Sequence, residues 1–288
     1  MGLGIKSKML RPMQKIDAHQ HFWIFDPVRD NWINDDMLAI KRDFLPADLN
    51  PVLHQYEIDG CIAVQASQTD EETMFLLTLA AANPFIKGVV GWVDLLAKDV
   101  DNQLEQYRRY DKLKGFRHVL QSEPDPKYML QPMFINGIAT LQKYGYSYDI
   151  LIYPEHLPFA AQLAAKLPYQ RFVVDHIAKP AIKDKKIGDW KKDIEALATH
   201  QNVYCKISGL LTEADWTNWK IEDFTPYLDM VLNAFGISRI MFGSDWPVCN
   251  LAGGYEGTME VLTTYFESFS TTDKDSFWSG NAIDFYRL

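Results

Sequence analysis

Eight short apolar segments recur along this chain, and most are followed by a segment with the composition of a helix. Several are rich in valine, isoleucine and aromatic residues, which is typical of parallel strands buried on both faces. The predicted strands cover residues 15–18, 60–66, 86–93, 113–119, 147–152, 172–175, 203–207 and 240–243. Strand and helix alternating eight times over 288 residues predicts an α/β fold, a (β/α)8 TIM barrel in a single domain.

The segments between these strands carry helix signals of their own. Thr69 precedes three acidic residues as an N-cap does, and Gly236 follows an apolar stripe at helical spacing. Helices are predicted over residues 46–57, 70–81, 157–167, 189–199 and 224–235. The main alternative is an open doubly wound sheet, but no glycine-rich phosphate loop follows a strand. The irregular stretch 26–44 is expected to form a long loop over the top of the barrel.

Charge and cysteine content exclude several classes of protein. A formal net charge of −9 with scattered basic residues argues against a nucleic acid partner. No window approaches the ~18 consecutive apolar residues of a membrane span, so no membrane partner is expected. Three widely spaced cysteines, Cys61, Cys205 and Cys249, favour a reducing compartment, and the predicted location is cytoplasmic. We predict one domain over 1–288 that includes an N-terminal extension over 1–14, and no feature specifies an oligomeric state.

Polar and titratable side chains gather where the predicted strands end. In a barrel of this type the working residues lie at the C-terminal ends of the strands. These positions hold His19, His21, Gln65, Trp92, Asp94, Arg117, His118, Asp149, Asp175, His176, Lys206, Ser208 and Asp245. This enrichment in reactive groups favours an enzyme over a structural protein.

The first and last of these strand ends together predict a metal site. His19 and His21 are two residues apart, so in a strand both imidazoles point the same way and can chelate one divalent cation. The alternative is a hydrogen-bonded pair in a loop. Asp245 ends an apolar strand beside Trp246, where a carboxylate is poorly solvated unless a metal or an imidazole pairs with it. One site built from both ends of the chain favours a closed barrel.

The other strand-end residues can each be interpreted as catalytic or binding residues, or as structural ones. His176 is either a site residue or a hydrogen-bonded core histidine, and His118 is either a third imidazole or a group beneath the substrate. Arg117 suits a carboxylate or a polyhydroxylated ring, or else makes a structural ion pair. His156 follows the fifth strand, where a loop residue can reach a substrate. One interpretation of Lys206 is that it carries its charge out of the barrel end. The tryptophans Trp23, Trp32, Trp92 and Trp246 are candidates for the floor of a sugar pocket or for core packing.

Five sequence motifs make the chain resemble the amidohydrolase superfamily. They are residues 16–23 (IDAHQHFW), 115–118 (GFRH) with Gln121 after it, 173–180 (VVDHIAKP), 206–210 (KISGL) and 242–247 (FGSDWP). Within the superfamily the chain is similar to the lactonase-like group that includes L-fuconolactonase, L-rhamnonolactonase and 2-pyrone-4,6-dicarboxylate lactonase. The resemblance spans residues 17 to about 286 and implies a distorted (β/α)8 barrel that hydrolyses a small lactone. The implied substrate is a sugar aldonolactone, which places the enzyme in carbohydrate metabolism.

The resemblance also implies roles for individual residues. His19, His21 and Asp245 would be metal ligands, with Asp245 and His176 catalytic. Binuclear relatives carry a bridging lysine after the fourth strand, whereas this chain has Arg117 and His118 there, which argues against two metals. Lactonases of the group work with one divalent ion or with none, so a single zinc ion and no metal both stay open. The implied substrate-binding residues are Arg117, His118, Gln65, Trp23, Trp92 and His156.

The implied mechanism has Asp245 take a proton from the water that attacks the lactone carbonyl and then return it to the ring oxygen. Either a cation or the histidines would hold the developing negative charge. One alternative is a metal-dependent decarboxylase of an aromatic acid in the same superfamily. A second is a carbohydrate-binding barrel without catalysis, which would not need an acid beside imidazoles.

Overall fold

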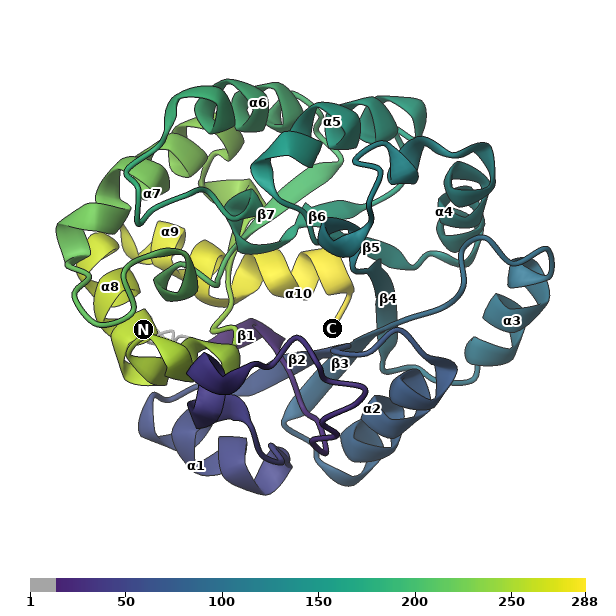
Figure 1. Ribbon diagram of the computed structural model, residues 1–288, viewed down its shortest axis with the longest axis horizontal. Helices are drawn as coiled ribbons and strands as arrows, with labels where there is room; N and C mark the ends of the chain where they lie inside the picture. Colours follow the sequence, from purple (N-terminus) through teal and green to yellow (C-terminus); the bar gives the residue numbers. More distant parts are fainter. Residues whose placement is uncertain (1–13) are drawn as a thin grey trace, which may run out of the picture.

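The computed structural model describes residues 14–288, which form one barrel of eight parallel strands arranged in sequence order (Figure 1). The strands are β1 (Ile16–Gln20), β2 (Gly60–Val64), β3 (Ile86–Gly91), β4 (Leu113–His118), β5 (Ser147–Ile150), β6 (Phe172–Val174), β7 (Val203–Ile207) and β8 (Ile240–Phe242). The predicted (β/α)8 barrel is confirmed, although β1 runs two residues further than expected. Of the predicted N-terminal extension, residues 1–13 lie outside the described part of the chain.

Eight helices follow the strands and surround the barrel in order (Figure 1). They are α1 (Pro46–Gln55), α2 (Asp70–Ala82), α3 (Val100–Tyr107), α4 (Pro132–Tyr144), α5 (Leu157–Lys166), α6 (Gly188–Ala198), α7 (Ile221–Phe235) and α8 (Gly254–Tyr265). The five helices with clear sequence signals match α1, α2, α5, α6 and α7, and the Thr69 hydroxyl accepts from the Glu72 amide as an N-cap (3.1 Å). Within residues 14–288, no helix combines the length and apolar character needed to cross a membrane.

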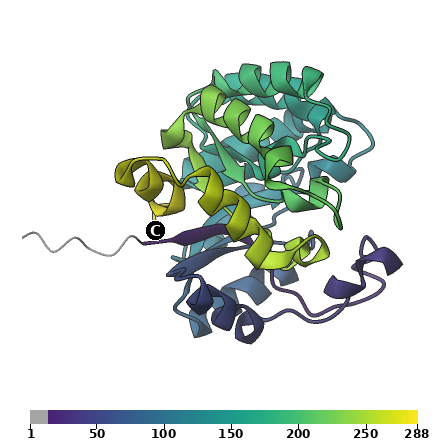
Figure 2. The ribbon, with the colours of Figure 1, turned by 90° about the vertical axis from the view of Figure 1, so that its left-hand side faces the viewer.

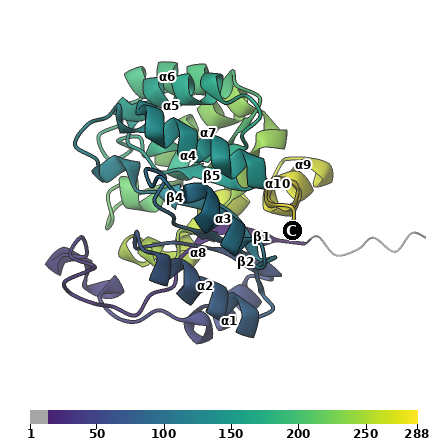
Figure 3. The same cartoon turned by 90° about the vertical axis from the view of Figure 1, so that its right-hand side faces the viewer.

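The C-terminal segment closes one end of the barrel. It consists of α9 (Thr271–Asp275), a π-helical turn (Ser276–Gly280) and α10 (Asn281–Tyr286). Figures 2 and 3 show these elements at the end opposite the long loop between β1 and α1. The apolar side chains of α10 pack with inward-facing strand residues into one cluster: Ile16, Ala18, Ile62, Val64, Val90, Val173, Met241, Ala282, Phe285 and Tyr286. This apolar floor leaves the opposite end of the barrel for the site.

An irregularity in β1 turns His19 toward the interior. Ala18 already faces inward, so strict alternation would send the next side chain outward. The pairing of β1 with β2 shifts register between Asp17 and Gln20, as at a β-bulge, and the Gln20 amide donates to Cys61 Sγ (3.3 Å) outside the barrel. Ala18, His19 and His21 therefore all face the interior.

The barrel closes between β8 and β1 through a short and distorted junction. The Asp245 amide donates to the His19 carbonyl (2.8 Å), and the His21 amide donates to the Trp246 carbonyl (2.7 Å). The backbones approach so closely that a Cβ on Gly243 would lie 2.7 Å from the Cβ of His19. Only glycine fits at this position, and the junction brings the carboxylate of Asp245 beside the two imidazoles.

We expect Asp17→Asn to stabilise the protein more at pH 7 than at pH 4. Burial raises the pKa of Asp17 to about 6 from 3.8, although the carboxylate accepts from the Ser244 amide (2.9 Å), the His19 amide (3.1 Å) and the Tyr255 hydroxyl (3.2 Å). Because the folded-state pKa is raised, the ionised carboxylate costs about 3 kcal/mol above pH 6, and this cost disappears as the group is protonated toward pH 4.

Chemical denaturation of both proteins across this pH range measures the effect. The free energy of unfolding of Asp17→Asn minus that of the wild type should rise by about 3 kcal/mol from pH 4 to pH 7. A difference that does not vary with pH would contradict the assignment.

Candidate active site

A cavity of about 710 Å³ opens at the C-terminal ends of the strands. Its lining residues come from the end of β4 and from loops that follow β1, β2, β4, β5, β6, β7 and β8. His21, Arg117, His176 and Asp245 line it, and the predicted loop over the top contributes Trp23, Arg29, Asp30, Asn31, Trp32 and Met37. The volume suits a small molecule. A second cavity of about 760 Å³ lies beside Lys15, His54 and Phe85, away from these strand ends.

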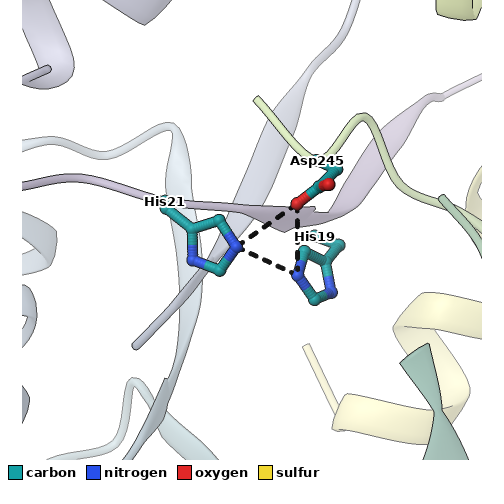
Figure 4. A group of neighbouring side chains, drawn as sticks. All are labelled: His19, His21 and Asp245. Carbon is teal, nitrogen blue, oxygen red and sulfur yellow. Dashed lines mark hydrogen bonds and ion pairs between the residues drawn. The ribbon is translucent and has the colours of Figure 1, made fainter. Parts of the chain in front are cut away.

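His19, His21 and Asp245 meet in this region (Figure 4). Oδ1 of Asp245 lies 3.4 Å from Nε2 of His21 and 3.8 Å from Nε2 of His19. The two Nε2 atoms are 3.2 Å apart. Burial raises the pKa of Asp245, but His176, His21 and Lys179 more than offset this, so the pKa lies below its usual value and the group is a carboxylate at neutral pH.

The hydrogen bonds around the two imidazoles decide which nitrogen carries the proton. Nδ1 of His21 lies 2.8 Å from the carbonyl oxygen of Val64, which can only accept, so Nδ1 is protonated and Nε2 keeps a lone pair. Arg117 can only donate and lies 3.3 Å from Nε2 of His19, so this Nε2 is also unprotonated. Nδ1 of His19 faces both the Asp175 carboxylate (3.3 Å) and Nζ of Lys206 (3.1 Å). Burial lowers the pKa of both histidines and keeps the rings neutral.

Two lone pairs therefore face each other, an arrangement that a shared cation stabilises. Zinc binds imidazole nitrogen at ~2.0–2.1 Å, so two ligands at the tetrahedral angle lie about 3.3 Å apart. The Nε2 atoms of His19 and His21 have this separation, and Asp245 adds a carboxylate. Two imidazoles and one carboxylate form a ligand set that zinc accepts in catalytic sites. The residues thus fit one divalent cation.

His176 reaches the site through a left-handed turn. Residues 176–179 all have positive φ, from 48° to 60°, although none is glycine. Such a conformation costs roughly 1–2 kcal/mol per residue, and runs of this kind persist only where surrounding structure imposes them. Nδ1 of His176 lies 2.9 Å from Ser208 Oγ. A Cβ on Gly209 would lie 2.6 Å from the same Nδ1 atom. The turn directs both His176 and Lys179 into the cavity.

A layer of buried charges lies between the apolar floor and the site. Nζ of Lys206 is 2.5 Å from Asp149 and 3.1 Å from Asp175, and it lies 3.1 Å from Nδ1 of His19. Arg117 pairs with the other Asp175 oxygen at 3.1 Å. Burial raises the pKa of Asp175, but Lys206, His19 and Arg117 together outweigh it and hold that pKa well below its usual value. Lys206 is fully buried, so the reading that it carries charge out of the barrel end is wrong.

Four predicted substrate-binding residues lie outside the cavity lining. His118 follows Arg117 in β4 and therefore points to the opposite face, where it stacks on Tyr128. The side chain of Gln65 donates to the carbonyl oxygen of Arg117 (3.1 Å), and so supports the arginine. Neither Trp92 nor His156 is among the described residues that line the cavity; Nδ1 of His156 lies 3.3 Å from the carbonyl oxygen of Tyr153.

Four charged residues of the cavity lining were not predicted as site residues: Arg29 and Asp30 in the loop over the top, and Lys179 and Glu213. Lys179 and Glu213 both line the cavity, with Nζ and Oε1 3.8 Å apart. Lys179 lies three residues beyond His176, so its nearness to a predicted site residue was a usable signal. Glu213 lies six residues beyond β7 in a short 3-10 turn (Leu211–Glu213). The expectation that site residues lie at strand ends does not extend this far into a loop.

Comparison with known proteins identifies the family. The model of the amidohydrolase family matches residues 16–288. The chain belongs to the amidohydrolase family. This amidohydrolase is 38% identical over 285 residues to an L-fucono-1,5-lactonase of Burkholderia multivorans, covering 95% of this chain and 96% of that relative. It is 27% identical to an L-rhamnono-gamma-lactonase of Scheffersomyces stipitis over 206 residues, covering 61% of this chain and 59% of that one.

A solved structure is similar over nearly the whole amidohydrolase chain. It is a zinc-bound amidohydrolase of Burkholderia multivorans with a TM-score of 0.93 and 38% identity, covering 96% of this chain and 99% of that one. The predicted family is therefore confirmed. The residues of this amidohydrolase that could hold one cation lie at the strand ends where the sequence predicted them.

Proposed function

We propose that this amidohydrolase hydrolyses a sugar aldonolactone of the L-fucono-1,5-lactone type to the open hydroxy acid. The observation that carries the proposal is the approach of Asp245 to the neutral imidazoles of His19 and His21 at one cavity. The 38% identity to an L-fucono-1,5-lactonase supports it. The aromatic walls of the cavity, Trp23, Trp32 and Trp216, suit the C–H faces of a sugar ring.

In the proposed mechanism Asp245 is the general base. It accepts a proton from the water that attacks the lactone carbonyl, and it returns this proton to the ring oxygen as the carbon–oxygen bond breaks. With the Ser208 hydroxyl, 2.9 Å from Nδ1 of His176, acting as donor, that imidazole carries its proton on Nε2 and would donate it in a hydrogen bond to the developing oxyanion. Arg117 pairs with Asp175, which lies against Nδ1 of His19 and orients that ring, and Gln65 donates to the carbonyl oxygen of Arg117. A zinc ion held by His19, His21 and Asp245 would supply Lewis-acid catalysis.

Release of acid across a panel of aldonolactones, followed with a pH indicator, tests the proposal. We expect hydrolysis of six-membered sugar lactones and no carbon dioxide from aromatic acids. Carbon dioxide without ring-opened product would identify a decarboxylase instead. Binding of lactones without turnover would identify a carbohydrate-binding barrel.

We expect about one zinc ion per chain and a loss of lactonase activity after chelation, because the paired Nε2 lone pairs of His19 and His21 need a cation. Metal analysis and activity assays before and after dialysis against a chelator measure both. Adding zinc back should restore activity. Full activity in protein shown to be free of metal would instead favour direct catalysis by the histidines.

A further inference from the structure

Cationic side chains that line the cavity are already paired with carboxylates. Nη2 of Arg29 lies 2.8 Å from Asp30, and Arg117 lies 3.1 Å from Asp175. The third cation in the described lining, Lys179, lies 3.8 Å from its own carboxylate partner. A carboxylate on a substrate would therefore meet no uncommitted positive charge along this wall. The lining suits an uncharged ligand.

The pair formed by Lys179 and Glu213 differs from the other two in being loosely joined. At 3.8 Å the two groups attract each other but leave hydrogen-bonding positions open on both. Each side chain is about one-fifth exposed, at 18% and 21%, and this remaining exposure is toward the cavity that both line. Nζ of Lys179 also lies 5.7 Å from the centre of the Tyr153 ring.

The backbone holds both members of this pair. Lys179 ends the left-handed turn that begins at His176, with φ at 49°. Glu213 ends its 3-10 turn, and its carbonyl oxygen accepts from the Lys183 amide at 2.9 Å. The donor and the acceptor therefore stand side by side at a fixed place near the proposed general base. Vicinal hydroxyl groups of a sugar ring can donate to the carboxylate and accept from the ammonium at the same time.

We infer that Lys179 and Glu213 are the specificity-determining pair that binds the ring hydroxyls of a neutral lactone and rejects a lactone that bears a carboxylate. The inference rests on the proposed lactonase function. Rejection follows because an anionic substituent here would face the charges of Glu213 and Asp245, with Lys179 already neutralised by its partner. Burial and the nearby Asp245 charge raise the pKa of Glu213 although Lys179 lowers it, so a further anion at this wall would add to the repulsion.

Steady-state kinetics with two lactones of the same ring test this inference. One is a neutral aldonolactone, and the other is the aldaric monolactone with a carboxylate at its terminal carbon. For Glu213→Gln we expect kcat/KM to fall about 10- to 100-fold for the neutral lactone, since a hydrogen bond to a charged group is lost. We expect it to rise about tenfold for the carboxylated one, since Lys179 becomes available to it.

The selectivity ratio between the two lactones is the decisive readout, because a change in the fraction of folded enzyme cancels from it. Asp101→Asn is the control: it removes the carboxylate of an exposed ion pair with Lys143 (2.6 Å), and the ratio should not change. If Glu213→Gln cannot be purified, Lys179→Met should lower kcat/KM for the neutral lactone without any gain for the carboxylated one.

The outcomes separate this inference from the proposed function. A wild-type enzyme that hydrolyses neutral lactones, with a Glu213→Gln variant of unchanged selectivity, overturns the role of the pair and leaves the lactonase assignment intact. Equal kcat/KM of the wild type on both lactones also overturns it. A wild type that hydrolyses neither lactone removes the proposed function, and the inference with it.

Discussion

Replacing Asp245 with asparagine should lower the turnover of sugar lactones by roughly two to four orders of magnitude. Asparagine keeps the shape of the side chain but cannot accept the proton of the attacking water. Asp245 stands alone in this role because it is the described carboxylate that lies within 4 Å of all three imidazoles, those of His19, His21 and His176. Its lowered pKa keeps it ionised across the neutral range.

Turnover number and zinc content, measured on the same preparation, test this prediction. Glu123→Gln is the matched control, since Oε1 of Glu123 lies 2.6 Å from Nε2 of His118 in a partly buried imidazole–carboxylate pair outside the cavity lining. We expect the control to retain near-normal turnover. Near-normal lactonase rates in Asp245→Asn would show that Asp245 is not the base. If the only defect of this variant is the absence of bound zinc, the role of Asp245 is restricted to metal binding.

The largest effect on stability is expected from Lys206→Met, which should lower the free energy of unfolding by about 3–5 kcal/mol. The ammonium group is fully buried and contacts both Asp149 (2.5 Å) and Asp175 (3.1 Å). Methionine keeps most of the length of the side chain but leaves Asp149 without a cation and Asp175 with Arg117 alone. Uncompensated buried charge, rather than lost packing, is the cause of the predicted loss.

Urea denaturation of the variant and a second substitution test this cause. Asp149→Asn in the Lys206→Met background removes the stranded charge and should restore part of the lost stability. The control Lys143→Met removes an exposed ion pair and should leave stability nearly unchanged. A Lys206→Met protein as stable as the wild type, or a double variant less stable than the single one, would show that this charge layer is not required.

Strand and helix positions were largely predictable because burial imposes a simple pattern on each element. A parallel strand covered on both faces needs a run of apolar residues, and seven of the eight predicted strands differ from the observed ones only at one or both ends, by one or two residues. β7 agrees at both ends. The C-terminal plug, α9 and α10, was not predicted, because short helices carry little periodic signal and their packing partners lie far away in the chain.

The sequence predicted which strand ends form the candidate site, but not which way each side chain points. Arg117 and His118 are neighbours in one strand, so only one of them can face the interior. His19 faces inward because a register shift in β1 interrupts the alternation after Ala18. Glu213 lies in a loop turn, where no periodic rule places it.

The order of residues along the chain determined the barrel, the strand ends that carry reactive groups and the family, because these depend on local composition and spacing. Three-dimensional packing alone decided that Lys206 is neutralised within the barrel, that His118 is turned away and that Lys179 meets Glu213 in the cavity wall. Such pairings depend on distances between segments far apart in the chain. Those distances are fixed by the closure of the sheet and not by any segment on its own.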